Sequence, residues 1–168
     1  KKEVTIYGAG MSGLVTAINL ARDGYRVTVH DREKDYGGDP LYNPSVHTTP
    51  ISPKKTSEYI GIDITSAFHP QLVLPSYFHE TRVEDCPPAS GEYTVERGNR
   101  PTSLDSLLYP MACDLGVKFK FNSPLKPTDI GLLEPGTIIA CGLTPSVYEM
   151  FDIPYRKWYG YVSRGEIG

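Results

Sequence analysis

The N-terminal part of the chain switches between two hydrophobic periods. A short apolar run over residues 4–7 is followed by apolar side chains at the three-to-four spacing of one helix face: Leu14, Ala17, Ile18 and Ala21. This spacing ends at Gly24, and residues 25–30 resume as a strand in which Val27 and Val29 alternate with polar side chains. The pattern predicts a strand, a tight turn, a helix and a strand, a βαβ unit whose two strands run parallel.

Three glycines occupy the turn and the start of this helix. Gly8 allows a sharp turn off the strand, Gly10 leaves room for a pyrophosphate beside the backbone, and Gly13 lets the helix approach the sheet. The first helical amides, at Met11, Ser12 and Gly13, would point at a ligand whose negative charge the helix dipole favours. The spacing therefore predicts dinucleotide binding, with a glycine-rich structural turn as the alternative.

An acidic residue follows the second strand. Asp31 lies roughly 20 residues beyond the glycines, where a carboxylate can accept hydrogen bonds from a ribose hydroxyl. The same charge would repel a 2′-phosphate, which disfavours NADP, and the neighbouring Arg32, also expected at the cofactor, weakens this argument only slightly. FAD and NAD remain.

A second glycine pair narrows the choice through a resemblance. Asp31 is followed by five residues and then Gly37 and Gly38, which resembles the extended fingerprint of the two-dinucleotide-binding-domain flavoproteins. In those families the second pair lies close to the phosphate and ribityl region of the flavin. The resemblance implies FAD as the cofactor and a flavin-dependent oxidoreductase as the function.

A second helix followed by a strand lies further along the chain. Apolar side chains repeat at helical spacing over residues 104–115, with Ser103 as a possible cap and Gly116 as a stop, and residues 117–121 form a strand. The segment 93–122 resembles the geranylgeranyl-reductase-like branch of FAD oxidoreductases, in which an arginine before this helix lies near the flavin. Arg97 matches that position best and Arg100 is the competitor; a solvated loop arginine is the alternative.

A third segment places another glycine at the expected cofactor. Residues 137–140 predict a buried strand, and Cys141 and Gly142 stand where the flavoproteins of this resemblance commonly have Ala-Thr-Gly beside the adenine end of FAD. Gly142 keeps the close backbone approach. Cys141 is expected to pack and not to react, because nothing nearby in sequence would lower its pKa.

Residues 39–92 change character, because prolines interrupt them repeatedly. Two stretches, 58–65 and 72–84, predict strands, which we expect to lie against the βαβ sheet. The histidines of this region, His47, His69 and His79, have no acidic partner at metal-ligand spacing, so no metal site is predicted.

Composition limits the classes of function. A chain of 168 residues favours one domain, and a net charge of −3 without a basic cluster argues against a nucleic-acid partner. No apolar run approaches the roughly 20 residues that span a bilayer. The three cysteines lack Cys-x-x-Cys spacing, which favours a reducing, cytoplasmic location over a disulfide framework or a zinc site.

Together these patterns predict a three-layer, Rossmann-like α/β domain with a parallel sheet and a small β-rich insertion. We divide residues 1–168 into a dinucleotide fingerprint (1–38), an insertion (39–92), the rest of the domain (93–150) and the start of a substrate domain (151–168). Because family members are much longer and carry a later Gly-Asp motif, the chain is expected to be an N-terminal FAD-binding part that is inactive alone. Its small-molecule substrate, catalytic residues and oligomeric state stay open. The alternatives are a non-catalytic nucleotide-binding module and a fragment of an NAD-dependent dehydrogenase.

Overall fold

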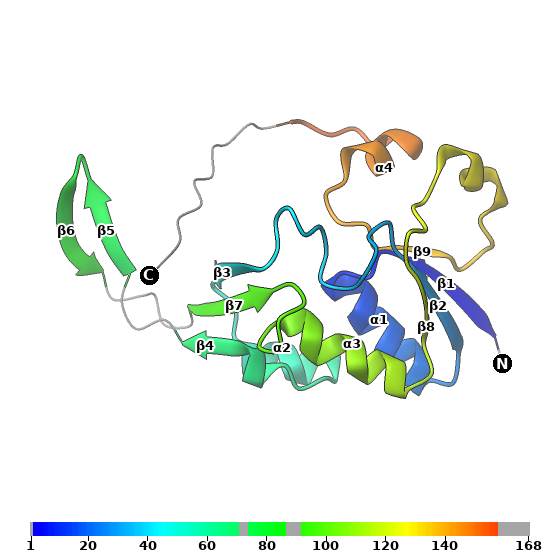
Figure 1. Ribbon diagram of the computed structural model, residues 1–168, viewed down its shortest axis with the longest axis horizontal. Helices are drawn as coiled ribbons and strands as arrows, with labels where there is room; N and C mark the ends of the chain where they lie inside the picture. The colour runs from blue at the N-terminus through cyan, green and yellow to red at the C-terminus, as the bar shows by residue number, and fades with distance from the viewer. Residues whose placement is uncertain (1, 71–73, 87–91, 158–168) are drawn as a thin grey trace.

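The computed structural model describes residues 2–70, 74–86 and 92–157. Its centre is a four-stranded parallel sheet in the order β8-β2-β1-β9 (Figure 1). The strands are β1 (Glu3–Tyr7), β2 (Arg26–His30), β8 (Lys118–Lys120) and β9 (Ile138–Ile139). This confirms the parallel βαβ unit and places β1, the strand before the glycines, in the interior of the sheet.

The core lies between this sheet and two packed helices, α1 (Met11–Arg22) and α3 (Leu104–Asp114). Leu14, Ala17 and Ile18 of α1 are fully buried, as the helical spacing predicted, and Ile6 and Val29 oppose them from the sheet. In the view of Figure 1, α1 and α3 lie below the sheet and the short α4 (Pro145–Met150) lies above it. The three-layer α/β architecture of the prediction is therefore confirmed.

The strands of the insertion form separate sheets and do not pair with the parallel sheet. Two of them, β3 (Ser45–Thr49) and β4 (Phe68–Pro70), flank β7 (Tyr93–Arg97) in a separate antiparallel sheet. The stretch 72–84 contains most of a hairpin of β5 (Leu74–Phe78) and β6 (Thr81–Cys86). Strand β7 was not predicted, although Tyr, Thr and Val are typical strand residues.

The predicted strand over residues 58–65 is wrong, because a helix covers its first part. Helix α2 (Pro53–Ile60) begins after Ser52, whose hydroxyl accepts from the amide of Lys55, and ends at Gly61 in the left-handed conformation. Two isoleucines after the helix, Ile62 and Ile64, are buried and give the stretch its apparent strand period. The cap residues Ser52 and Gly61 are the sequence signals that favour a helix over a strand here.

Two 3₁₀ helices complete the described elements, η1 (Thr65–Ala67) and η2 (Pro127–Leu132). None of the helices in the described part of the chain has both the length and the apolar character to cross a bilayer. The strand expected within residues 156–168 falls almost wholly outside the described residues.

Candidate dinucleotide-binding site

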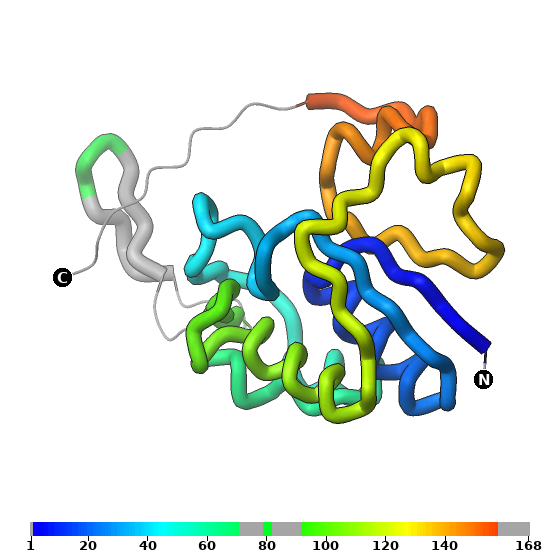
Figure 2. The backbone as a smooth tube through the Cα atoms, turned by 45° about the vertical axis from the view of Figure 1, so that its right-hand side comes forward, coloured from blue at the N-terminus to red at the C-terminus, as the bar shows by residue number. Residues whose placement is uncertain are grey.

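A pocket of about 360 Å³ lies at the carboxyl ends of the parallel strands. Figure 2 shows why distant residues meet there: the ends of β1 and β2, the segment after β8 and the segment after β9 run side by side. Open α/β sheets bind ligands at this edge. The predicted site residues that line the pocket are Gly8, Gly10, Met11, Ser12, Asp31, Arg32, Gly38, Arg97 and Gly142.

Two glycines of the fingerprint are required by the fold itself. A β-carbon on Gly8, which has φ +110°, would lie 2.3 Å from the carbonyl oxygen of Ala140. A β-carbon on Gly13 would lie 1.9 Å from the carbonyl oxygen of Gly8, and Gly13 is buried and does not line the pocket. Gly8 therefore lets the turn pack against the segment that follows β9, and Gly13 lets helix α1 pack against the turn.

Gly10 has a different role from the other two. Its β-carbon would meet no atom of the described part of the chain within 4 Å, and any residue can adopt its backbone φ of −76°. Gly10 lines the pocket, so the space that its missing side chain leaves belongs to the pocket and not to the protein interior. This is the geometry expected where a ligand must approach the backbone.

The start of helix α1 favours an anion at the same place. Its N-cap is Gly10, which offers no side-chain hydrogen bond, and its first turn carries no acidic residue. Met11 and Ser12 of that turn line the pocket. Because the first amides of a helix lack intrahelical acceptors and lie at the positive end of its dipole, a phosphate is well suited to this position.

Asp31 holds the glycine turn in place. Its Oδ2 accepts from the amide of Ala9 at 2.5 Å, and its Oδ1 accepts from the amide of Glu33 at 2.9 Å. A carboxylate offers about four lone-pair sites, so acceptor capacity remains for a ribose hydroxyl. The carboxylate thus has a structural role in addition to the ligand role predicted for it.

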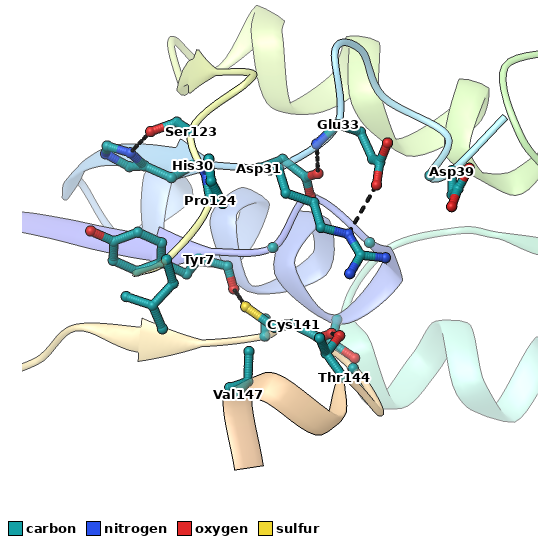
Figure 3. A pocket seen from close by; sticks show the side chains of 18 of the residues that line it. Tyr7, His30, Asp31, Glu33, Asp39, Ser123, Pro124, Cys141, Thr144 and Val147 are labelled. Carbon is teal, nitrogen blue, oxygen red and sulfur yellow. Dashed lines mark hydrogen bonds and ion pairs between the residues drawn. The ribbon is translucent and has the colours of Figure 1, made fainter. Parts of the chain in front are cut away.

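The surroundings of Asp31 are acidic. Glu33 and Asp39 also line the pocket, and Arg32 donates from Nε to Oε1 of Glu33 at 2.9 Å (Figure 3). The one cation next to Asp31 in sequence is therefore already paired with an anion. This arrangement disfavours a 2′-phosphate, as the sequence predicted.

The second glycine pair is divided between two roles. Gly38, with φ +79°, lines the pocket. Gly37, with φ +95°, does not line it; a β-carbon there would lie 2.6 Å from the carbonyl carbon of Gly98. Gly37 therefore allows the segment after β2 to pack against the loop that follows β7.

Of the two arginines considered before α3, Arg97 lines the pocket and Arg100 does not, among the residues that the structure describes. Arg97 lines it and forms a two-point ion pair with Asp105, from Nε to Oδ2 at 2.8 Å and from Nη2 to Oδ1 at 2.9 Å. Arg100 approaches Glu96 at 3.5 Å, its side chain is 65% exposed, and it is not among the described residues that line the pocket.

Sequence reasoning missed the part of the site that follows β8. Ser123 donates its amide to the carbonyl of Asp31 at 2.7 Å, and its hydroxyl lies 2.8 Å from Nδ1 of His30. Pro124 lies beside them (Figure 3), and Pro124 and Leu125 both line the pocket. The available signal was the position of this segment after a predicted parallel strand, where such loops form ligand sites.

Two aromatic residues at this end have shifted pKa values. Burial and the charge of Lys120 lower the pKa of His30, against an opposing effect of Asp129. Burial raises the pKa of Tyr7, and Asp129 and Cys141 add to the shift. The rings of Tyr7 and His30 lie 5.0 Å apart. Both pKa shifts favour the uncharged form of the side chain.

The segment after β9 contributes a glycine that lines the pocket and a cysteine that packs beside it. Gly142, with φ +64°, lines the pocket and has no neighbour within 4 Å of its β-carbon position. Burial and Asp31 raise the pKa of Cys141, whose thiol donates to the carbonyl of Tyr7 at 3.4 Å, although Arg32 opposes the shift. The raised pKa agrees with a packing role. Within the described residues, no three His, Cys, Asp or Glu side chains are arranged to hold a metal ion.

Comparisons with known proteins agree with this geometry. Residues 6–43 match the family model of the NAD(P)-binding Rossmann-like domain. The fold is Rossmann-like. In sequence the chain is 43% identical over 137 residues to flavin-containing monooxygenase FMO GS-OX3 of Arabidopsis thaliana, covering 80% of this chain and 28% of that protein. It is 34% identical over 71 residues to FMO GS-OX2 of the same plant, covering 42% of this chain and 16% of the relative.

Solved structures show the same fold at lower identity. The tetrameric form of 2-methyl-3-hydroxypyridine-5-carboxylic acid oxygenase matches with a TM-score of 0.56 at 19% identity, over 76% of this chain and 34% of that chain. CtdE in complex with FAD matches with a TM-score of 0.54 at 17% identity, over 76% and 33%. The chain thus spans less than a third of the length of the two monooxygenase relatives.

Proposed function

We propose that the chain is the FAD-binding part of a flavin-dependent oxidoreductase. The observation that carries this proposal is the open position at Gly10, where the pocket meets the uncapped start of α1. No atom of the residues that the structure describes lies within 4 Å of that β-carbon position, and the helix terminus favours a negative charge there. A pyrophosphate satisfies both conditions.

The lining residues divide naturally along a dinucleotide. Gly10, Met11 and Ser12 would hold the pyrophosphate, Asp31 a ribose, and Gly142 the adenine end. FAD supplies the redox chemistry when it is bound, and the protein binds and orients it. No described residue is assigned a catalytic role here, and a small-molecule substrate belongs to the proposal for the whole protein.

FAD is favoured over NAD by residues that lie beyond this ADP half. Gly38 and Arg97 extend the pocket lining past the glycine turn. The likeness to flavin-containing monooxygenases supports the same choice. The paired state of Arg32 and the carboxylates of Asp31, Glu33 and Asp39 speak against NADP.

Finer assignments remain proposals. A place in the geranylgeranyl-reductase-like branch is supported by Arg97, which lines the pocket just before α3, whereas the relatives reported above are monooxygenases. Oxygen consumption by a full-length, FAD-loaded protein would favour the monooxygenase side. The division of residues 1–168 into four segments and the cytoplasmic location also remain predictions.

The proposal is tested by calorimetric titration of the 168-residue chain with FAD, ADP, NAD and NADP. We expect binding of FAD and ADP, and weaker binding of NADP. In Gly10→Val the new side chain enters the pocket and not the core, so this variant should unfold like the original chain and bind neither FAD nor ADP. Its matched control is Gly13→Ala, which should lose stability because its β-carbon meets backbone. Unchanged affinity in folded Gly10→Val, or tighter binding of NADP than of FAD, contradicts the proposal.

A further inference from the structure

Asp105 is fully buried, and the dinucleotide-binding residues proposed above do not include it. Of the acidic residues whose burial the structure describes, it is the one that is buried, at 0% exposure. Burying a carboxylate is costly unless it is paired and hydrogen-bonded. A charge kept in the first turn of α3 therefore needs an explanation beyond packing.

Asp105 accepts three hydrogen bonds from one short segment. Its Oδ1 accepts from Nη2 of Arg97, and its Oδ2 accepts from Nε of Arg97 and from the amide of Gly98, all at 2.8–2.9 Å. Ser103 strengthens the same connection, because its hydroxyl donates to the carbonyl of Gly98 at 2.5 Å. Helix α3 thus fixes both the side chain of Arg97 and the backbone that follows it.

The fixed segment belongs to the wall of the pocket. Arg97 lines the pocket, and its side chain remains 23% exposed although Asp105 is buried. The ion pair uses two of the five N–H donors of the guanidinium, which leaves three for another acceptor. Gly98 in turn lies against Gly37, next to the pocket residue Gly38.

We propose that Asp105 is a positioning residue for the cofactor. It holds the guanidinium of Arg97 in one orientation, so that the remaining donors meet acceptor oxygens of FAD that lie beyond its AMP part. This inference rests on the proposed FAD-binding function. A guanidinium without a fixed orientation would bind the FAD oxygens less tightly, because it recognises pairs of oxygens through its planar geometry.

The test compares FAD with AMP, because AMP lacks the part of FAD that Arg97 would meet. In Asp105→Asn and in Arg97→Lys we expect the affinity for FAD to fall by about ten- to hundredfold, as for a lost hydrogen bond to a charged group. The affinity of both variants for AMP should stay within about twofold of the original chain. A purely structural role of Asp105 would lower both affinities together or neither. Arg100→Gln is the matched control, because it removes an exposed arginine three positions away that does not line the pocket.

A double variant shows whether Asp105 acts through Arg97. In the Arg97→Lys background, Asp105→Asn should change FAD affinity by less than about twofold. The guanidinium that Asp105 orients is already absent from that background. If Asp105→Asn does not fold, Arg97→Lys alone carries the test, and unchanged FAD affinity in that variant overturns the proposal. Full FAD affinity in folded Asp105→Asn overturns it as well. A chain that binds neither FAD nor AMP before substitution contradicts the proposed function instead.

Discussion

Asp31 accepts the amides of Ala9 and Glu33, so its carboxylate is part of the folded turn before any ligand arrives. Asp31→Ala should therefore lose about 1–3 kcal/mol of unfolding free energy, because two backbone donors lose their acceptor. Affinity for ADP should also fall, by about ten- to hundredfold. Denaturant unfolding and ADP titration measure the two effects.

The two roles of Asp31 are separated by comparing ADP with 2′-deoxy-ADP. If the carboxylate accepts from the ribose 2′-hydroxyl, the original chain prefers ADP and Asp31→Ala loses that preference. A variant that still prefers ADP to the same extent would assign Asp31 to the fold alone.

His30 predicts how stability depends on pH. Burial lowers its pKa in the folded chain from the ordinary value of 6.5, so the unfolded chain takes up this proton first as the pH falls. The stability associated with neutral His30 is complete above about pH 6.5 and is lost as the pH falls through the lower, folded-state pKa. We expect His30→Gln to show a flatter decline in unfolding free energy between about pH 7 and 5.

The control for His30 is His69→Gln, because His69 is exposed on strand β4. If the unfolding free energy of His30→Gln depends on pH as that of the original chain does, folding does not lower the pKa of His30.

At the scale of an element, helix α2 depends on its C-terminal glycine. Gly61 has φ +67°, and a β-carbon there would meet nothing within 4 Å, so a substitution costs only backbone strain. Gly61→Ala should lower the unfolding free energy by about 1–2 kcal/mol, the cost of a left-handed conformation. Gly131→Ala is the matched control, because its site is equally open and has no positive φ. Thermal unfolding of both variants decides; equal stability would mean that the helix end rearranges at little cost.

The elements that sequence could predict are those whose pattern is local. The run of Leu14, Ala17 and Ile18 identified α1 because one face of that helix packs on a sheet already implied by its flanking strands. The isoleucines around Gly61 led to a wrong strand prediction because α2 is short and mostly polar. Ile62 and Ile64 are buried by tertiary packing and do not belong to a strand. The pairing of β3 and β4 with β7 joins segments far apart in the chain, which no local pattern encodes.

The same division applies to the site. The glycine fingerprint and Asp31 were predictable because one βαβ unit places them together. Ser123 and Thr144 were not, because they reach the pocket only through the order of β8 and β9 in the sheet. The role of Gly37 was also hidden, since it is defined by the backbone of Gly98 and not by a ligand.

At the scale of the whole molecule, the question is whether the 168-residue chain can carry out a redox reaction alone. The pocket has a volume of about 360 Å³. Among its described lining residues, we assign the glycine turn, Asp31 and Gly142 to the ADP half of FAD, and Gly38 and Arg97 to the part beyond it. A reaction also needs the flavin and substrate held in near-attack geometry with water excluded. We therefore predict that the chain binds FAD or ADP weakly and turns over no substrate.

The measurement is steady-state reduction of an artificial acceptor by the FAD-reconstituted chain with NADH or NADPH, with free FAD and Gly10→Val as controls. Sustained turnover well above both controls would mean that these residues already form a complete site.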